Sequence, residues 1–481
     1  MPKVQFANRL TRLVGRFLMN RNGNIAVIFA LTMVPLIFLL GMTLDFTQAL
    51  RKKEQLDAAA DAAAIAAVRP AMLMQTDAVA VATATAIFNS TARSLTGLSA
   101  IPTPTITVTD VGLQRTVSVS YNAGSLNNFP KVLNNTTSWP ISGSSTAQAA
   151  SAPNMNWYLL MDDSPSMGIG ATNSDIATLI TATRNQPASS ANCGFACHET
   201  HPNSDSGANS STKDNLTIAR ANNVTLRIDL VVNALNQLLI GWSNCPQAGV
   251  TGGVMQCMSA LNNTTYKAAL YTFDTGLNTL AALTTPTTAG TKVSSISLMA
   301  VDHQNCVVLG ACNTDYGTDI AGALNSLNGI MPAPGLGSNA AGDTPQEVVF
   351  LVTDGFEDKI VSGASACPNA TLAPSKRCQQ PLDTTACTTL KNRGIKIAIL
   401  YTEYLQLIAN ATTGIQTTDS WYMSWVDTYD EPAPSTGTIA QKLQACASPG
   451  FYSNVTTGGN ITDALTNLFI KVASSTASLS Q

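Results

Sequence analysis

One short run of the sequence has the residue types and the spacing of a metal-ion site. The run DDSPS at 162–166 has the pattern D-x-S-x-S, so that Asp162 presents a carboxylate and Ser164 and Ser166 present hydroxyls within a single turn. These oxygen atoms are ligands for a hard cation. Hydroxyls are poor ligands alone, so the site needs further oxygen atoms from other loops. The simpler interpretation of the same run is a helix-capping turn.

Two further loops are predicted to supply those oxygen atoms. Thr318 comes immediately before a predicted helix at 319–327, and Asp354 follows a predicted strand at 347–352. In a sheet of mostly parallel strands, ligands bind where the carboxyl ends of the strands meet. Two carboxylates, three hydroxyls and water would complete an octahedral sphere, which suits Mg2+, or another divalent cation such as Ca2+ or Mn2+, better than Zn2+. The predicted ligands are Asp162, Ser164, Ser166, Thr318 and Asp354.

The sequence pattern after Pro153 predicts the strands and helices that position these residues. Short apolar runs alternate there with segments of helical periodicity, which predicts an α/β fold with a mostly parallel, Rossmann-like sheet and helices on both faces. The predicted strands are 157–161, 268–273, a weaker one at 277–283, 347–352, 395–401 and 451–454. The predicted helices are 216–240, 319–327, 384–392 and 461–473.

A transmembrane helix is predicted near the N-terminus. The segment 25–44 carries no charged residue, and about 20 apolar residues are enough to cross a bilayer as a helix. A cleaved signal peptide is the alternative, but the apolar run is longer than a usual signal core, and no small-x-small site closes it before Asp45. The preceding tail carries basic residues and no acid, which predicts a cytoplasmic N-terminus and an outward-facing remainder.

The spacing of apolar residues changes from helical to alternating between the predicted transmembrane helix and the α/β domain. An Ala-rich run of strong helix formers covers 51–68, a second helix is predicted at 77–95, and alternating apolar residues then predict a hairpin and a third strand. The predicted organisation is a cytoplasmic basic tail at 1–23, a transmembrane helix at 24–45, a helical stalk at 46–98, a small β-rich neck at 99–152, the α/β domain at 153–475 with insertions at 170–213 and 403–446, and a tail at 476–481.

Composition narrows the class of protein. Only 11% of the residues are charged, the formal net charge is -3, and no long basic run occurs, which excludes nucleic-acid binding as the main activity. All ten cysteines lie beyond residue 190, and this even number predicts disulfides formed in an oxidising compartment. The sequence leaves the connectivity open; neighbouring residues suggest the pairs Cys245/Cys257, Cys306/Cys312, Cys367/Cys378 and Cys387/Cys446.

A cluster of Cys193, Cys197, His198 and His201 offers a second kind of chemistry. Its cysteine spacing is one residue too long for haem attachment, which requires C-x-x-C-H. Its loop is short for a tetrahedral zinc site. A disulfide in an exposed loop is the preferred interpretation, and a zinc site stays open as the alternative.

No catalytic site is expected. The sequence contains no G-x-S-x-G elbow, P-loop or H-E-x-x-H motif. Asp162 and Asp163 are consecutive at a strand end, where neighbouring side chains point apart, so they are poor candidates for an acid and base pair. A hydrolase that uses a water molecule on the same cation is the enzymatic alternative.

The five predicted ligands resemble the metal-ion-dependent adhesion site of von Willebrand factor type A domains, and the order of strands and helices after residue 153 is similar to that fold. The resemblance implies that the cation keeps an open or water-filled position for a carboxylate or similar oxygen of a protein partner. One departure from the family pattern is a stretch of about forty residues, rich in Ser, Asn and Thr, between Ser166 and the first predicted helix.

A second resemblance covers the N-terminal part of the chain. The segments GNIAVIFALTMVPLIFLLGMTLDF and QLDAAADAAAIAAV, together with LQACASPGFY near the C-terminus, look like TadG-type tight-adherence (Flp) pilus assembly proteins. This resemblance implies a protein of the bacterial inner membrane, with its bulk in the periplasm or at the cell surface and a pilus component as its partner. Pilin-like relatives carry a Glu shortly after the processing glycine, but no Glu follows Gly23 closely here, so we expect the anchor to be permanent. A purely structural tether, in which the cation only stabilises the loops, is the main alternative.

Overall fold

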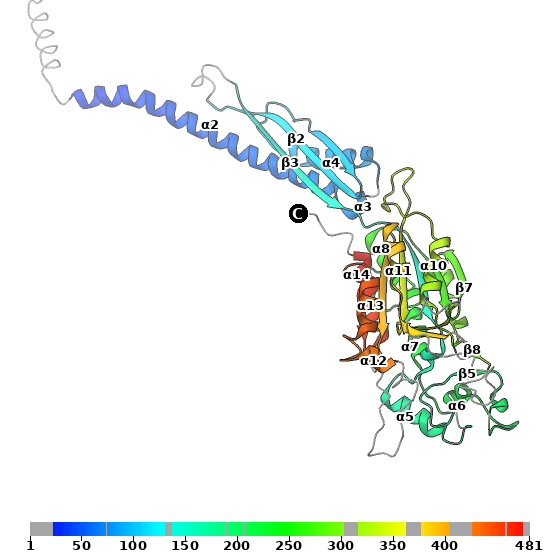
Figure 1. Ribbon diagram of the computed structural model, residues 1–481. Helices are drawn as coiled ribbons and strands as arrows, with labels where there is room; N and C mark the ends of the chain where they lie inside the picture. Colours follow the sequence, from blue (N-terminus) through cyan, green and yellow to red (C-terminus); the bar gives the residue numbers. More distant parts are fainter. Residues whose placement is uncertain are drawn as a thin grey trace, which may run out of the picture. The chain divides into compact units, whose positions relative to one another are not determined.

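The computed structural model describes residues 23–73, 75–129, 137–187, 190–205, 207–302, 316–361, 377–404, 426–456 and 459–474. These residues form two compact units, Met1–Ala150 and Ser151–Gln481 (Figure 1). Four of the predicted features fall outside the described residues, wholly or largely: the basic tail, the C-terminal tail, the pair Cys306/Cys312, and Cys367.

Within its described residues, the first unit combines three helices with an antiparallel sheet of three strands in the order β1-β2-β3. Its helices are α2 (Gly23–Ala67), α3 (Pro70–Leu73) and α4 (Asp77–Ala92), and its strands are β1 (Thr105–Val111), β2 (Gln114–Leu126) and β3 (Ser138–Ala150). The alternating apolar residues of the predicted hairpin lie in β1 and β2, where Val117, Val119 and Tyr121 point into the core of the unit.

Helix α2 has two halves with different surroundings. The part from residue 25 to about 40 is apolar and exposed, and α2 is the one helix among the described residues that is long and apolar enough to cross a membrane. The part beyond residue 48 packs against α4 and the sheet (Figure 1). Its alanines are buried against Ala84 and Phe88 of α4, because small side chains let two helices approach closely. The Ala-rich run is therefore the core side of a folded unit.

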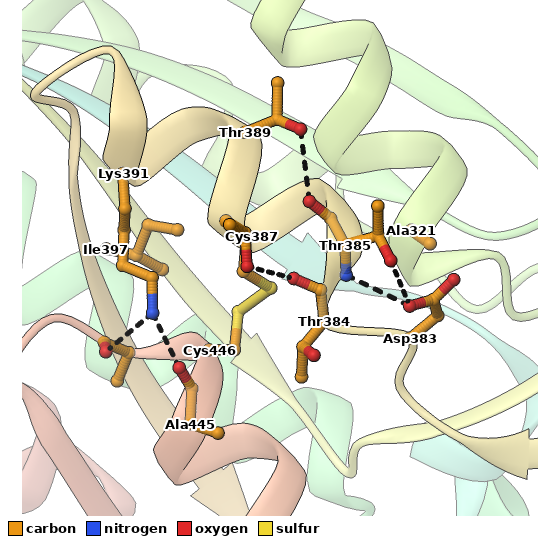
Figure 2. Close-up of a disulfide and its surroundings, with 12 residues drawn as sticks. Ala321, Asp383, Thr384, Thr385, Cys387, Thr389, Lys391, Ile397, Ala445 and Cys446 are labelled. Carbon is orange, nitrogen blue, oxygen red and sulfur yellow. Dashed lines mark hydrogen bonds between the residues drawn. A yellow bond between two sulfur atoms is a disulfide. The ribbon is translucent and has the colours of Figure 1, made fainter.

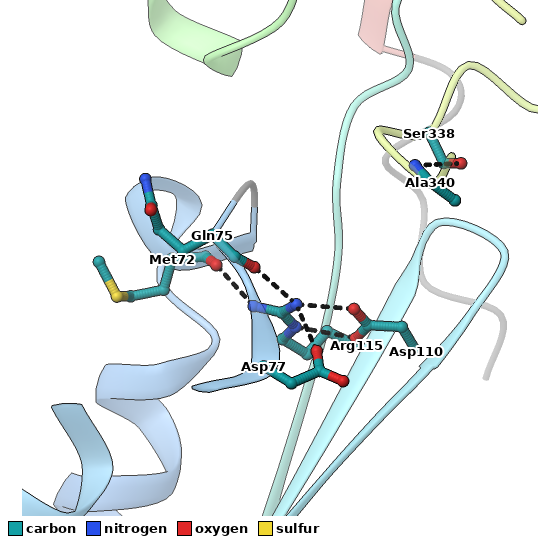
Figure 3. Close-up of polar contacts among 7 residues, drawn as sticks. All are labelled: Met72, Gln75, Asp77, Asp110, Arg115, Ser338 and Ala340. Atoms are coloured by element: carbon teal, nitrogen blue, oxygen red, sulfur yellow. Dashed lines mark hydrogen bonds and ion pairs between the residues drawn. The ribbon is translucent and has the colours of Figure 1, made fainter. Parts of the chain in front are cut away.

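A buried arginine joins the α3–α4 corner to the hairpin of the first unit (Figure 3). Arg115 of β2 donates two hydrogen bonds to the carboxylate of Asp110, at 2.8 and 2.6 Å. It also donates to the carbonyl oxygens of Met72 and Gln75, at 2.6 and 2.9 Å, and to the carboxylate of Asp77 at 3.1 Å. The guanidinium thus satisfies carbonyl groups at a corner that no regular hydrogen-bond ladder covers.

Replacing Arg115 with methionine should destabilise this corner. The substitution removes the Arg115 donor from the Gln75 carbonyl and the Asp110 carboxylate and one of two donors from the Met72 carbonyl, at a cost of about 2–3 kcal/mol. We expect faster hydrogen exchange in peptides that span 69–77 and 105–115 of the full chain in detergent. The exposed Arg93 provides the control, since Arg93→Met removes the same charge from the same unit. Unchanged exchange in the Arg115 variant would contradict this prediction.

The second unit is built on a six-stranded sheet in the order β13-β12-β9-β4-β6-β7. Its strands are β4 (Met155–Asp162), β6 (Tyr266–Phe273), β7 (Leu277–Thr284), β9 (Gln346–Thr353), β12 (Lys396–Thr402) and β13 (Tyr452–Val455). All neighbouring pairs are parallel except β6 with the edge strand β7. This confirms the predicted α/β fold with a mostly parallel sheet.

Helices cover both faces of this sheet (Figure 1). One face packs against α7 (Arg227–Leu239), α8 (Val254–Asn262) and α14 (Ile461–Ser474). The other packs against α5 (Asn173–Ala182), α10 (Ile320–Ile330), α11 (Thr385–Asn392) and α13 (Thr438–Cys446). Strand β4 is buried throughout because its side chains alternate between the faces: Trp157 points to the first face and Tyr158 to the second.

The structure corrects one predicted helix and adds others, of which three have nine or more residues. The single helix predicted at 216–240 is wrong, because α6 (Asn215–Ala221) ends before Asn223, whose φ of +54° no helix accommodates, and α7 begins at Arg227. Helices α5, α8 and α13 were not predicted. Helix α13 lies within the range predicted as a second insertion, yet it buries Ile439 and Leu443 in the core.

Two of the predicted disulfides lie wholly within the described residues and are present. One joins Cys245 to Cys257, and the other joins Cys387 to Cys446 (Figure 2). Cys387 lies in α11 and Cys446 ends α13, so the second bond links these two helices. Lys391 of α11 adds a hydrogen bond to the carbonyl oxygen of Ala445, at 2.6 Å, between the same two helices.

A buried carboxylate at the start of β9 makes stability depend on pH. Glu347 accepts a hydrogen bond from Asn156 at 2.8 Å through Oε1, whereas its buried Oε2 accepts none. Burial raises the pKa of Glu347 above its ordinary value. The folded chain therefore holds this proton more tightly than the unfolded chain does, and the resulting stability is lost as pH rises from about 4.3 through the raised pKa.

Glu347→Gln should therefore stabilise the chain at neutral pH, by about 1–3 kcal/mol. The gain over wild type should shrink towards zero below about pH 4.3, and denaturant unfolding at several pH values measures it. Asp343→Asn is a control of opposite sign. Hydrogen bonds from the Ser338 hydroxyl and from backbone N–H groups lower the pKa of Asp343, so its replacement should destabilise the chain more at neutral than at acidic pH. A pH-independent gain in Glu347→Gln would contradict the account.

Candidate metal-ion site

The predicted carboxylate of Asp162 lies at the carboxyl end of the central strand β4. It is fully buried, with Oδ1 accepting a hydrogen bond from the Ser164 backbone N–H at 3.0 Å and Oδ2 accepting one from the Thr353 hydroxyl at 2.6 Å. The hydroxyl oxygens of Ser164 and Ser166 lie 3.0 Å apart in the turn that follows. The D-x-S-x-S run thus gathers its three oxygen-bearing side chains beside the end of the neighbouring strand β9.

The second predicted carboxylate, Asp354, comes directly after β9 and is also fully buried. Its Oδ1 accepts a hydrogen bond from the Phe356 backbone N–H at 3.3 Å. Its buried Oδ2 accepts no hydrogen bond, and Nη1 of Arg227 lies 4.0 Å away. A buried carboxylate oxygen without a hydrogen-bond donor is unusual, because burying such a group unsatisfied is unfavourable.

The two acids share one low-dielectric environment. Burial raises the pKa of Asp162 well above its ordinary value, and the negative charge of Asp354 raises it further. Burial also raises the pKa of Asp354, while the positive charge of Arg227 opposes that rise. Two carboxylates whose charged forms are disfavoured in this way form a place where a divalent cation would be stabilised.

Thr318 lies on the loop next to the D-x-S-x-S run. Its backbone N–H donates to the carbonyl oxygen of Asp358 at 3.0 Å, and its carbonyl oxygen accepts from the Asp358 N–H at 2.9 Å. Asp358 belongs to β10 (Phe356–Ile360), which pairs with β11 (Arg377–Pro381). A Cβ atom added to Gly317 would lie 3.0 Å from Cδ of Pro165, so the two loops touch.

The structure therefore brings four of the five predicted residues into one cluster and places the fifth on the adjoining loop. Within the described part of the chain, no hydrogen bond joins the Thr318 hydroxyl to the other four side chains. The Asp162 and Asp163 side chains were predicted to point apart. The contacts of Asp163 agree, because its carboxylate pairs with Thr272 of β6.

The donor set decides which cations suit the site. Among the described residues, no group of three or more His, Cys, Asp or Glu side chains is placed to hold a metal ion. A cation here would rest on two carboxylates and on hydroxyl groups, and the unsatisfied Oδ2 of Asp354 offers it a ligand. Oxygen donors of this kind fit Mg2+ and similar hard cations.

The absence of such a group among the described residues also concerns the cluster of Cys193, Cys197, His198 and His201. Cys193 and Cys197 are buried, and His201 forms an ion pair with Asp302. These residues and His198 do not form a group of metal ligands. The zinc alternative therefore finds no support in their placement.

Two residues at the site were not predicted from the sequence. Arg227 is the first residue of α7, and Tyr404 follows β12; the guanidinium carbon of Arg227 lies 5.1 Å from the centroid of the Tyr404 ring. Neither residue belongs to a local motif. Only the sheet order, which sets β12 beside β9, brings Tyr404 close to Asp354.

Comparison with known proteins gives one family match. Residues 23–86 match the family described as "Putative Flp pilus-assembly TadE/G-like". The matched segment comprises α2, α3 and the first part of α4. No curated protein matches the chain.

Several solved structures are similar at low identity. The von Willebrand factor domain of the type V pili tip protein Mfa5 from Porphyromonas gingivalis is 11% identical, with a TM-score of 0.31, and covers 69% of this chain and 99% of its own. The conserved hypothetical protein BatB from Bacteroides thetaiotaomicron is 12% identical, with a TM-score of 0.30, and covers 66% and 99%. The PilB minor pilin from Streptococcus sanguinis is 10% identical, with a TM-score of 0.30, and covers 78% of each chain.

The strand order of the second unit is similar to the order expected from the resemblance to von Willebrand factor A domains: the first strand is central, the antiparallel strand lies at one edge, and three later strands extend the other side. An α/β unit with a mostly parallel sheet therefore follows a segment, residues 23–86, that matches the Flp pilus-assembly TadE/G-like family.

Proposed function

We propose that this chain is a membrane-anchored pilus assembly protein whose second unit binds a protein partner through a divalent cation. The cation, Mg2+ or a similar ion, would be held by Asp162, Ser164, Ser166, Thr318 and Asp354. The observation that carries the proposal is the pair of fully buried carboxylates at the carboxyl edge of the sheet, one of which keeps an oxygen without a hydrogen-bond donor.

The chemistry of such a site suits recognition. When bound, the cation would accept a carboxylate or similar oxygen atom from a partner. The partner would then complete a coordination sphere that this chain fills only in part. We infer that the partner is a pilus component, because the N-terminal segment is of the pilus-assembly family.

The proposed location follows from the anchor and the cysteines. Helix α2 supplies one apolar span, which fits a single-pass membrane protein that contacts lipid. The basic residues before it favour a cytoplasmic N-terminus and the bacterial inner membrane. The two disulfides of the second unit favour an oxidising compartment, hence the periplasm or the cell surface, for everything that follows.

A binding role is favoured over a catalytic one by the charged group beside the acids. That group is Arg227, whose guanidinium carries hydrogen-bond donors and no acceptor, so it cannot act as a general base. A hydrolase that activates water on the cation would need a base in its place. Metal-dependent turnover of a phosphoester or a peptide would revive the enzymatic alternative.

The experiment is capture of pilus components by the full chain, extracted from membranes in detergent, with Mg2+ or with EDTA. We expect wild type to retain the partner only with Mg2+, and Asp162→Asn to retain none under either condition. Asp163→Asn is the matched control, because it makes the same chemical change at the next residue, whose side chain faces Thr272.

A second pair of variants separates recognition from a structural tether. Asp162→Ala and Ser164→Ala should each lose the cation and also lose piliation and capture. If piliation and capture survive while the metal is lost, the chain is a tether and the binding proposal fails.

A further inference from the structure

A buried arginine stands beside the candidate cation site, and the site's ligand set does not account for it. Arg227 is only 3% exposed, and its Nη1 is buried without a hydrogen-bond partner. Oδ2 of Asp354, which also lacks a hydrogen bond, lies 4.0 Å from Nη1. The two groups face each other at a distance too long for a hydrogen bond and short enough for strong attraction in a buried site.

Several contacts fix the guanidinium in this place. Its Nη2 donates to the carbonyl oxygen of Glu403, and its plane lies over the Tyr404 ring, with the guanidinium carbon 5.1 Å from the ring centroid. The Arg227 backbone N–H donates to the carbonyl oxygen of Ile169 at 3.1 Å, three residues after Ser166. The charge is thus tied to the D-x-S-x-S loop on one side and to the end of β12 on the other.

Helix stability does not explain an arginine at this position. Arg227 is the first residue of α7, and the N-terminus of a helix carries partial positive charge that disfavours a cation. Burial of an arginine without a close ion pair adds a further penalty. The position is therefore unfavourable for the helix, which points to a role at the neighbouring carboxylates.

We propose that Arg227 is a fixed counter-charge for the cation site: it compensates Asp354 when no divalent cation is bound, and it weakens the affinity of the site for that cation. This inference rests on the proposed function. Because Nη1 does not bond to Oδ2, the oxygen stays available as a ligand, while the fixed positive charge repels an incoming divalent ion. The site then binds its cation reversibly and does not collapse between binding events.

The test uses the full chain in detergent and titrates it with MgCl2 by calorimetry. Arg227→Gln removes the charge, and Arg227→Lys keeps it. We expect Arg227→Gln to bind Mg2+ at least about ten-fold more tightly than wild type, by loss of this repulsion, and Arg227→Lys to bind within about three-fold of wild type. In the absence of Mg2+, Arg227→Gln should unfold at a lower temperature than wild type, and saturating Mg2+ should restore it.

Each outcome decides the inference. Equal Mg2+ affinity in all three proteins would overturn the inference that Arg227 is a counter-charge. Weaker Mg2+ binding by a folded Arg227→Gln chain would overturn it too. Both results would leave the proposed function intact. An Arg227→Gln chain that folds only with Mg2+ supports the inference, whereas one that is unfolded with and without Mg2+ shows a purely structural arginine and overturns it. If neither wild type nor Arg227→Gln binds Mg2+, the proposed function fails as well. Binding by Arg227→Gln alone would confirm the counter-charge and contradict a cation site in the wild type.

Discussion

Replacing Asp162 with asparagine should make the metal-free chain more stable and should abolish its stabilisation by Mg2+. Asparagine keeps the shape of the side chain and one acceptor oxygen for the Thr353 hydroxyl. Its amide nitrogen cannot accept from the Ser164 N–H, but the substitution removes one of two buried like charges. We expect the free energy of unfolding without metal to rise by about 1–3 kcal/mol. Wild type should gain about 2.7 kcal/mol at a Mg2+ concentration of 100 times Kd, and the variant should gain none.

Denaturant unfolding at pH 8 with EDTA or with Mg2+ measures both effects. Asp163→Asn serves again as the matched control. Burial raises the pKa of Asp163 to about 7, so this variant should also be stabilised without metal at pH 8, yet it should keep the full response to Mg2+. An equal Mg2+ response in wild type and Asp162→Asn would show that Asp162 is not a ligand.

Removing the disulfide between Cys387 and Cys446 should have the second large effect. The bond closes a loop of 59 residues, which corresponds to about 4 kcal/mol in the chain-entropy account, against about 3 kcal/mol for the bond between Cys245 and Cys257 with its separation of 12. We expect the double variant Cys387→Ala, Cys446→Ala to unfold at lower denaturant concentration than the double variant Cys245→Ala, Cys257→Ala.

The first pair should also affect the cation site, whereas the second should not. Helix α13 packs closely on the loop that carries Asp354: a Cβ atom added to Gly355 would lie 2.6 Å from Leu443 and 2.8 Å from Ile439. Loosening α13 should therefore weaken Mg2+ binding in the Cys387/Cys446 variant only. Unchanged affinity in that variant, measured while it is folded, would contradict this coupling.

The sequence predicted the central strands well because each is a continuous apolar run buried on both sides. Strands β4, β9 and β12 lie within two residues of their predicted bounds. The break between α6 and α7 was missed because 216–240 keeps a helical pattern of apolar residues through Asn222 and Asn223, whose backbone conformation interrupts it. Helix α13 was missed because the whole range 403–446 was predicted as an insertion.

Some residues of the candidate site can be predicted from a local motif, and others only from the tertiary fold. Asp162, Ser164 and Ser166 form one local motif, and the strand ends pointed to Asp354 and Thr318. Arg227 carries no such signal, because Asp354 lies 127 positions further along the chain and only the packing of α7 on the sheet brings the two together. The buried face of the Ala-rich helix was equally hidden, since a run of alanines has no polar side to contrast with an apolar one.

The most direct measurement is a calorimetric titration of the full chain in detergent with MgCl2, made on wild type, Asp162→Asn and Asp163→Asn. Our account predicts one Mg2+ per chain for wild type and for Asp163→Asn, and none for Asp162→Asn. No uptake by wild type, or undiminished uptake by Asp162→Asn, would contradict the account.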